Sequence, residues 1–234
     1  MKFTASAIAL ALMATGATAQ QFNGAEIVGN YGLRTDGSSS SIVYGHGAVE
    51  FGFGNFAVQA DLGAFAWTDE TVTQTFTTIH AIYNVSDNFV IGAFAGYENW
   101  PNETPVDWLN LGIEVKYTFS GMPVVIEAFY LNQNEMGTPA TPYEFFNLSV
   151  QYSVSESIDL TGGYMYYANG SSTDNTLMLA AHYNFDNGIS VGGEYAQSFD
   201  DSDPSSVFTL SVRKSFGGGV TFGPRNWAIG TRGL

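Results

Sequence analysis

The chain has no cysteine, few charged residues and no long apolar run, and each shortage excludes a class of structure. Without cysteine, no disulfide framework can hold the fold. No segment of the 234 residues approaches the roughly 20 consecutive apolar residues that a membrane-spanning helix needs. Charged residues make up 12% of the chain, well below the usual level of about a quarter. A helical membrane protein and an ordinary soluble domain are both disfavoured.

Positive charge is scarce as well, because 7 Lys and Arg residues stand against 22 Asp and Glu residues, for a formal net charge of −15. A protein that binds duplex nucleic acid through its phosphates needs the opposite sign, so we expect no nucleic-acid partner. The chain is rich in aromatic side chains, at 15%, and in glycine, with 27 residues. Low charge with many aromatics and glycines fits a β-barrel whose outer surface faces lipid.

The first nineteen residues have the pattern of a secretory signal. Lys2 gives a positive start, residues 3–14 form a short apolar run, and residues 17–19 (Ala-Thr-Ala) offer a small-x-small cleavage site. The run is too short to cross a bilayer as a helix. We expect a cleaved signal peptide over residues 1–19 and a mature protein that begins near Gln20.

The mature sequence alternates between strand-like runs and turn clusters. The runs are about 9–13 residues long, which suits membrane-spanning strands of ~9–11 residues better than sandwich strands of ~5–6. We expect about twelve strands, and ten if the fourth run and a neighbour lie outside the membrane. The runs cover residues 24–33, 42–53, 55–66, 72–85, 88–98, 107–119, 122–132, 144–154, 157–167, 175–185, 188–198 and 206–216.

Short and long connections alternate strictly between these runs, from the tight turn at Gly54 to clusters such as residues 98–105. Outer-membrane barrels have this asymmetry, with short turns at the periplasmic rim and long loops outside. Within a run the polarity has a period of two, so that Leu111 and Ile113 share one face while Glu114 lies on the other. The sequence predicts an all-β fold, a transmembrane antiparallel up-and-down β-barrel over residues 20–216, with both ends at the periplasmic rim.

Residues 208–216 (Phe-Thr-Leu-Ser-Val-Arg-Lys-Ser-Phe) resemble the terminal strand of Gram-negative outer-membrane porin-like proteins, in which alternate apolar residues end in Phe. With the signal and the alternation, the resemblance covers nearly the whole mature chain. Two features depart from it, since Lys214 takes an outward position that is usually apolar and residues 217–234 follow the final Phe216. The resemblance implies an outer-membrane location in contact with lipid and lipopolysaccharide. It leaves homo-oligomerisation open.

The inward positions of the expected barrel carry more carboxylates than cations. A ring of carboxylates biases a wet pore toward cations, and we assign that role to Glu50, Asp61, Glu114, Glu127 and Glu194. The alternative is an interior filled by ion pairs and hydrogen bonds, since a barrel of about twelve strands is narrower than a large porin. Glu26 and Asp159 also point inward. The expected pore-lining residues are His46, Glu50, Asp61, His80, Glu114, Lys116, Glu127, His182, Glu194 and Arg213.

Two inward groups could bind cations. Across the short turn at residues 120–121, a register that places Glu114 opposite Glu127 would raise one carboxyl pKa or recruit a cation, unless Lys116 neutralises the pair. Partial neutralisation by Lys116 is the plainer interpretation of that pair. We therefore expect no metal there and no cofactor elsewhere.

The second group is His46, Asp61 and His80, on three neighbouring runs. Allowed registers can bring them into one row, which could hold a divalent metal or respond to pH. Ordinary lumen polarity is the plainer interpretation.

Enzyme activity is disfavoured by the placement of the histidines. An outer-membrane phospholipase presents a Ser-His pair toward lipid, whereas His46, His80 and His182 all fall on inward positions. An omptin-like protease needs Asp and His at the outer rim, and only His46 lies near it. We expect no enzyme, with a hydrolase kept as the weakest alternative.

The external connections are acidic, and their simplest interpretation is a solvated surface. The stretch of residues 200–203 (Asp-Asp-Ser-Asp) could hold a divalent cation. The acidic residues assigned to these connections are Asp36, Asp69, Glu70, Glu98, Glu103, Glu135, Asp174, Asp200, Asp201 and Asp203.

Residues 217–234 open with three glycines, include Arg225 and Arg232, and contain no acidic residue. The glycines favour a flexible periplasmic tail. The other hypothesis is that this cationic segment folds back as a plug of the acidic lumen.

These observations favour a porin-like channel for passive diffusion of small hydrophilic solutes, weakly cation-selective, with no chemical step. The alternative is a structural or adhesive barrel with a closed lumen, whose extracellular loops bind a ligand.

Overall fold

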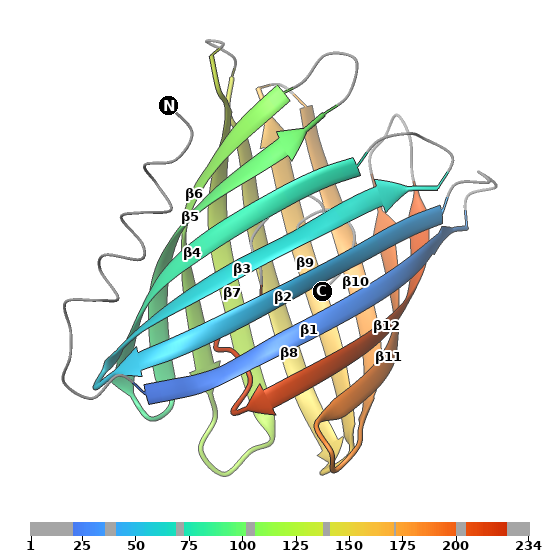
Figure 1. Ribbon diagram of the computed structural model, residues 1–234. Coiled ribbons are helices and arrows are strands. Elements are labelled where there is room, and N and C mark those ends of the chain that lie inside the picture. Colours follow the sequence, from blue (N-terminus) through green and yellow to red (C-terminus); the bar gives the residue numbers. More distant parts are fainter. Residues whose placement is uncertain are drawn as a thin grey trace.

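The computed structural model describes residues 21–35, 41–68, 73–101, 106–137, 141–170, 172–199 and 205–223. The expected signal peptide lies outside them. Twelve strands form an all-β fold, as the sequence predicts (Figure 1). The strands are β1 (Gln21–Arg34), β2 (Ser41–Phe53), β3 (Phe56–Trp67), β4 (Thr73–Ser86), β5 (Phe89–Trp100), β6 (Val106–Thr118), β7 (Val124–Glu135), β8 (Tyr143–Ser155), β9 (Ile158–Asn169), β10 (Ser172–Asn184), β11 (Ile189–Ser198) and β12 (Ser206–Gly217).

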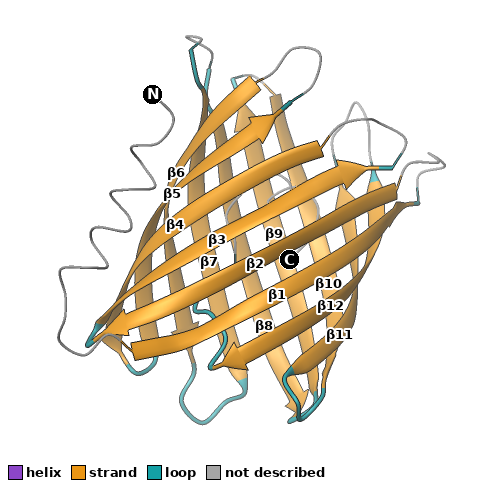
Figure 2. Ribbon diagram, in the orientation of Figure 1, coloured by secondary structure: helices purple, strands orange, loops and turns teal. Residues whose placement is uncertain are grey.

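The strands close into a barrel in which each pairs antiparallel with its sequence neighbours and β1 pairs with β12 (Figure 2). The closing register runs from Gly24 opposite Gly217 to Arg34 opposite Val207. Closure pairs the backbone polar groups between strands and leaves no exposed sheet edge. Among the described residues, no helix is long and apolar enough to cross a membrane. Because the strand number is even, β1 begins and β12 ends at the same rim.

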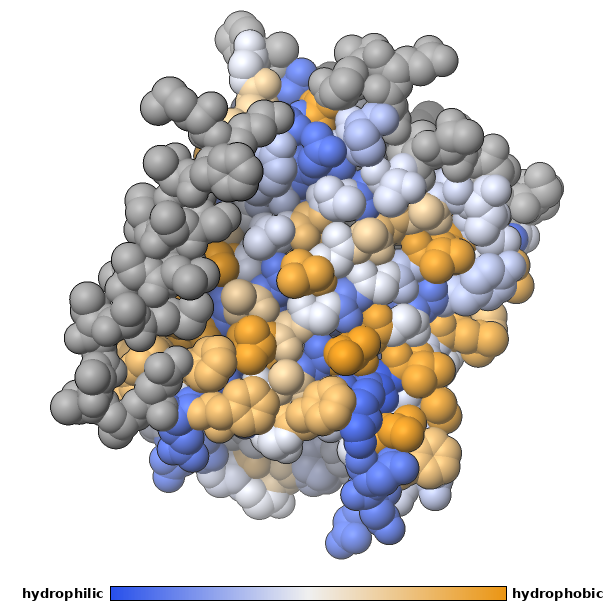
Figure 3. All heavy atoms as spheres, viewed as in Figure 1, coloured by the Kyte–Doolittle hydropathy of each residue, from blue (hydrophilic) through white to orange (hydrophobic). Residues whose placement is uncertain are grey.

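Every second side chain of each strand points outward, and these outward side chains are largely apolar. The outer surface of the barrel is therefore apolar. On β10, Leu177 and Leu179 are 50% and 69% exposed, while Met178 between them is 2% exposed. The same alternation on β6 exposes Ile113 and buries Glu114. Figure 3 shows apolar side chains spread across the strands of one face. An alternation of this kind matches a surface that faces hydrocarbon.

The connections define two rims, although their lengths alternate less strictly than the sequence suggests. We call one the turn-side rim, where residues 54–55, 87–88, 119–123, 156–157 and 185–188 join the strands. The other is the loop-side rim, with residues 35–40, 68–72, 101–105, 136–142, 170–171 and 199–205. The long connection implied between the expected runs at 157–167 and 175–185 is wrong, because β9 and β10 continue to a two-residue connection with Asn169 opposite Ser172.

The half of the interior next to the loop-side rim contains two apolar clusters. Both consist of inward side chains from the middle of the strands to their ends at that rim, and Leu131 and Phe145 are fully buried. One cluster comprises Phe94, Phe129, Leu131, Phe145, Met165, Met178 and Ala196. The other comprises Ile42, Tyr44, Phe65, Phe76 and Val207. This loop-side half is therefore partly filled by side chains.

Candidate functional site

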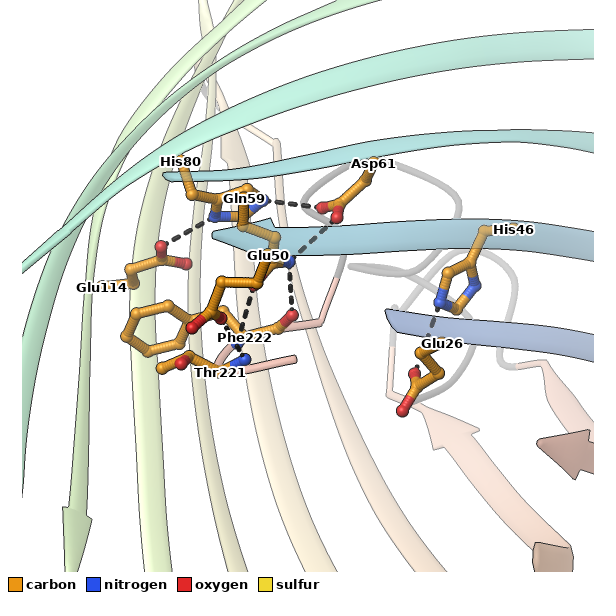
Figure 4. Close-up of polar contacts among 9 residues, drawn as sticks. All are labelled: Glu26, His46, Glu50, Gln59, Asp61, His80, Glu114, Thr221 and Phe222. Atoms are coloured by element: carbon orange, nitrogen blue, oxygen red, sulfur yellow. Dashed lines mark hydrogen bonds and ion pairs between the residues drawn. The ribbon is translucent and has the colours of Figure 1, made fainter. Parts of the chain in front are cut away.

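The turn-side half of the interior holds a buried imidazole between two carboxylates. His80 Nδ1 lies 2.8 Å from Glu114 Oε1, and His80 Nε2 lies 2.7 Å from Asp61 Oδ2 (Figure 4). All three side chains are almost completely buried. An imidazolium has an N–H on each nitrogen and can donate to both carboxylates at once. The arrangement pairs charges that would otherwise be buried alone.

Gly92 makes the contact between His80 and Glu114 feasible. His80 lies on β4 and Glu114 on β6, with β5 between them, and Gly92 is the β5 residue opposite Glu114. A Cβ atom at Gly92 would lie 2.6 Å from Glu114 Oε1. The absence of a side chain at this position of β5 thus lets His80 and Glu114 interact across the strand. Gly92 has no sequence motif that would have identified it.

The expected row of His46, Asp61 and His80 forms only in part. Asp61 and His80 meet, but His46 Nε2 lies 3.7 Å from Glu26 Oε1, and its ring packs against Tyr44. The cause is the register, which places His46 opposite Gly63 on β3, two residues beyond Asp61. Within the described part of the chain, no group of three or more His, Asp and Glu side chains is placed to hold a metal ion.

The expected pairing of Glu114 with Glu127 is wrong. Lys116 lies opposite Glu127, and Glu114 lies opposite Phe129. The connection between β6 and β7 spans residues 119–123 and contains Pro123, which has no N–H to join the ladder, so that pairing starts later on β7 than the short turn implied. The resulting shift of register places a cation against Glu127.

Glu98 was expected in an external connection, and the structure corrects this. It lies on β5, fully buried, and accepts hydrogen bonds from Gln74, Asn110 and Gln133. Its position is in phase with the inward Phe94, a period-two signal that could have identified it.

Two more of the acidic residues that were expected in external connections lie on strands. Asp174 lies on β10, where it accepts a hydrogen bond from Ser198, and Glu135 lies at the end of β7. The remaining residues of that acidic set, with the proposed cation site at 200–203, lie outside the described residues: Asp36, Asp69, Glu70, Glu103, Asp200, Asp201 and Asp203.

A cavity of about 260 Å³ lies inside the barrel. Five of the expected pore-lining residues border it: His46, Lys116, Glu127, His182 and Arg213. The other five are not among its lining residues and are at most 5% exposed: Glu50, Asp61, His80, Glu114 and Glu194. Hydroxyl and amide side chains form much of the remaining wall: Ser149, Gln151, Thr161, Asn184, Ser190, Thr209 and Ser211. Polar side chains therefore form a large part of the cavity wall, beside apolar ones such as Val28 and Phe65.

The chain beyond β12 turns into the lumen, a feature that sequence reasoning offered only as an alternative for residues 217–234. In Figure 1 this dark red segment bends back inside the strands. Thr221 N–H donates to Glu50 Oε2 at 2.7 Å, and the Phe222 side chain is 1% exposed. Gln59, which no sequence signal identified, hydrogen-bonds the backbone of Phe222. Residues 224–234 lie outside the described part.

A closed twelve-stranded antiparallel barrel with a polar internal cavity has the architecture of a porin-like outer-membrane protein. No family model matches the chain, and no curated protein matches its sequence.

Similar folds occur among solved structures. The KdgM porin is 12% identical, with a TM-score of 0.62 over 81% of this chain and 98% of its own. The NanC porin is 12% identical, with a TM-score of 0.60 over 80% and 98%. The CymD monoaromatic hydrocarbon channel is 10% identical, with a TM-score of 0.51 over 89% and 92%. At such low identities these similarities extend to the fold alone.

Proposed function

We propose that the protein is an outer-membrane channel for passive diffusion of small hydrophilic solutes, weakly selective for cations, without a catalytic step. The observation that carries this proposal is the polar cavity inside a closed barrel whose outer surface is apolar. Export with cleavage after residue 19, insertion among outer-membrane lipid and lipopolysaccharide, and possible association of barrels are parts of the same proposal.

Water in the cavity is supported by buried polar atoms of residues that line it. Asn30 Oδ1, the Tyr44 hydroxyl and His46 Nδ1 are buried without a hydrogen-bond partner among the described residues, and all three residues line the cavity. Buried polar groups nearly always have partners, and solvent is the one that a polar cavity offers. A hydrated cavity is a requirement for passage of hydrophilic solutes.

The charge around the cavity supports only a weak preference for cations. Glu26, Glu127 and Asp159 line it together with Lys116 and Arg213, so that the carboxylates exceed the permanent cations by one. Arg213 Nε lies 3.5 Å from Glu26 Oε2 and partly offsets that charge. Fixed charges along a pore set the local potential for entering ions.

The same charges favour a solute different from that of one structural neighbour. One KdgM porin structure is described as a complex with disordered oligogalacturonate, a polyanion. The net excess of one carboxylate on the cavity wall of this chain would disfavour such a solute. We expect cations and neutral hydrophilic molecules to pass more readily than acidic oligosaccharides.

Planar bilayers test the proposal with the refolded full-length protein. The expected result is discrete conductance steps and, under a salt gradient, a reversal potential of the sign that cation preference produces. Heat-modifiable migration in gels confirms that each sample is folded. A folded protein without discrete steps would contradict the channel.

That negative result would favour the second candidate, a structural or ligand-binding barrel with a closed lumen. The specific observation behind this alternative is the pair of apolar clusters that fill much of the loop-side half.

A further inference from the structure

The segment that follows β12 is held by the barrel wall through its backbone. Lys116 Nζ donates to the carbonyl oxygen of Thr221 at 2.7 Å, and Glu50 accepts from the Thr221 N–H. The side-chain amide of Gln59 pairs with Phe222 in both directions, with Nε2 donating to the carbonyl at 2.7 Å and Oε1 accepting from the N–H at 3.2 Å. Side chains of β2, β3 and β6 therefore satisfy all four polar backbone groups of two consecutive residues.

The Phe222 side chain has its own pocket in the wall. Its ring packs with Ala57, Ile82 and Val90 and stacks on His80 at a centroid distance of 6.4 Å and an interplanar angle of 15°. His80 is the imidazole fixed between two carboxylates (Figure 4). The buried polar network thus forms one side of an aromatic pocket.

The backbone also provides a turn that directs the segment inward. Gly217 and Gly219 have φ values of +63° and +76°, in the left-handed region that favours glycine. On β1, a Cβ atom at Gly24 would lie 1.9 Å from the carbonyl oxygen of Gly219. Glu50 links the same strand to the segment, because its other oxygen accepts a hydrogen bond from Asn23 at 2.8 Å. These glycines permit a defined turn and a close approach.

From these contacts we infer that the turn-side wall is a peptide-binding site whose occupant is residues 220–223 of this chain, and that the bound segment narrows the channel. Val220, Thr221, Phe222 and Gly223 all line the cavity, so the segment occupies space that would otherwise belong to it. Release of the segment widens the path. The conductance test below rests on the proposed channel function, whereas the exchange test does not.

Full-length variants test this binding site. Gln59→Ala removes both hydrogen bonds to Phe222 without a change of charge, and Phe222→Ala removes the ring from its pocket. Gln133→Ala is the matched control, because Gln133 is a buried wall amide whose partner is Glu98 in the loop-side half. Gln59→Ala is expected to raise single-channel conductance roughly twofold, since conduction follows the free width of the pore. The control is expected to conduct like the wild type.

The double variant separates release of the segment from simple loss of volume. If either substitution alone releases residues 220–223, Gln59→Ala combined with Phe222→Ala conducts no better than the better single variant. Independent, multiplying increases would overturn the inference, as would an equal rise in Gln133→Ala or unchanged conductance in Gln59→Ala and Phe222→Ala.

Hydrogen exchange gives a readout that does not depend on conduction. The Thr221 and Phe222 amides are expected to be protected in the wild type and to exchange at least about tenfold faster in Gln59→Ala. Fast exchange at these amides in the wild type would overturn the inference. A wild type that is silent in bilayers but protected at these amides would contradict the channel and leave the peptide-binding site supported.

Discussion

The two halves of the barrel interior are built from different chemistry, although the same twelve strands pass through both. The loop-side half contains the two apolar clusters and the hydrogen bonds around Glu98. The turn-side half contains the network of Asp61, His80 and Glu114, the bound segment 220–223 and most of the charged residues that line the cavity. The cavity reaches the loop-side half mainly along β12 and β1–β3.

The difference shows how one fold can combine stability with the permeability that we propose. Apolar packing in the loop-side half removes side chains from water, and it leaves a path beside one sector of the wall. In the turn-side half, buried charges are held in pairs, which avoids the large cost of an isolated charge. In the proposed channel, the bound segment sets the width of the solute path in one half and the aromatic side chains set it in the other.

The largest expected effect comes from His80. In His80→Ala, Asp61 and Glu114 keep their buried charges but lose the group between them, and breaking a buried ion pair typically costs about 3–5 kcal/mol. We expect a loss of that size in the free energy of unfolding, measured by denaturant titration in lipid vesicles. His182→Ala is the control, because Asp159 opposite His182 keeps hydrogen bonds from Ser153 and Asn184. Equal losses in both variants would remove the special role of the network.

The next effect concerns the apolar loop-side half. Leu131 is fully buried, so Leu131→Ala is expected to lower the free energy of unfolding by about 2–5 kcal/mol through lost contacts and a cavity. Leu179→Ala is the matched control on the outward face, where the side chain is 69% exposed in the isolated barrel. The control is expected to lose less than half as much. The opposite order would mean that the loop-side interior is not packed as described.

A smaller effect is expected at Gly92, where the lack of a side chain allows Glu114 on β6 to contact His80 on β4. In Gly92→Ala the new Cβ would push Glu114 away from His80, and overpacking of this kind costs roughly 1–3 kcal/mol. At Gly29 nothing lies within 4 Å of an added Cβ, so Gly29→Ala is the control and is expected to be nearly neutral. The same titration compares the two variants, and similar losses would show that Gly92 is not a packing requirement.

The smallest effect concerns selectivity. Glu127 lines the cavity, whereas Glu98 is buried among amides of the loop-side half and does not. Under a salt gradient, Glu127→Gln is expected to move the reversal potential toward zero by an amount on the order of a few millivolts. Glu98→Gln is expected to leave it unchanged. A shift in the Glu98 variant alone would place the ion path elsewhere.

Local patterns in the sequence were sufficient to predict the strands and their faces. A period of two is a property of each strand by itself, and it correctly placed Glu114 and His80 inside. Glu98 followed the same rule and was misassigned only because it lies near a connection. The twelve strands and their closure are confirmed.

Contacts between distant strands could not be predicted in the same way. The partner of Glu114 depends on the β6–β7 register and on the lack of a side chain at Gly92. Neither can be read from the period-two polarity of a single strand. The glycines after Phe216 favoured a flexible tail, yet Gly217 and Gly219 take the backbone angles of a defined turn. Recognition of Phe222 by Gln59 joins positions too far apart in the chain for any local periodicity to connect.

Cysteine accessibility tests the central claim of a solute path through the polar cavity most directly, because the natural chain contains no cysteine. Ser211 lines the cavity, and Met165 is 1% exposed within the loop-side apolar cluster. A small charged thiol reagent is expected to reduce the single-channel conductance of Ser211→Cys in one step and to leave Met165→Cys unchanged. Block of Met165→Cys with no effect on Ser211→Cys would contradict the account.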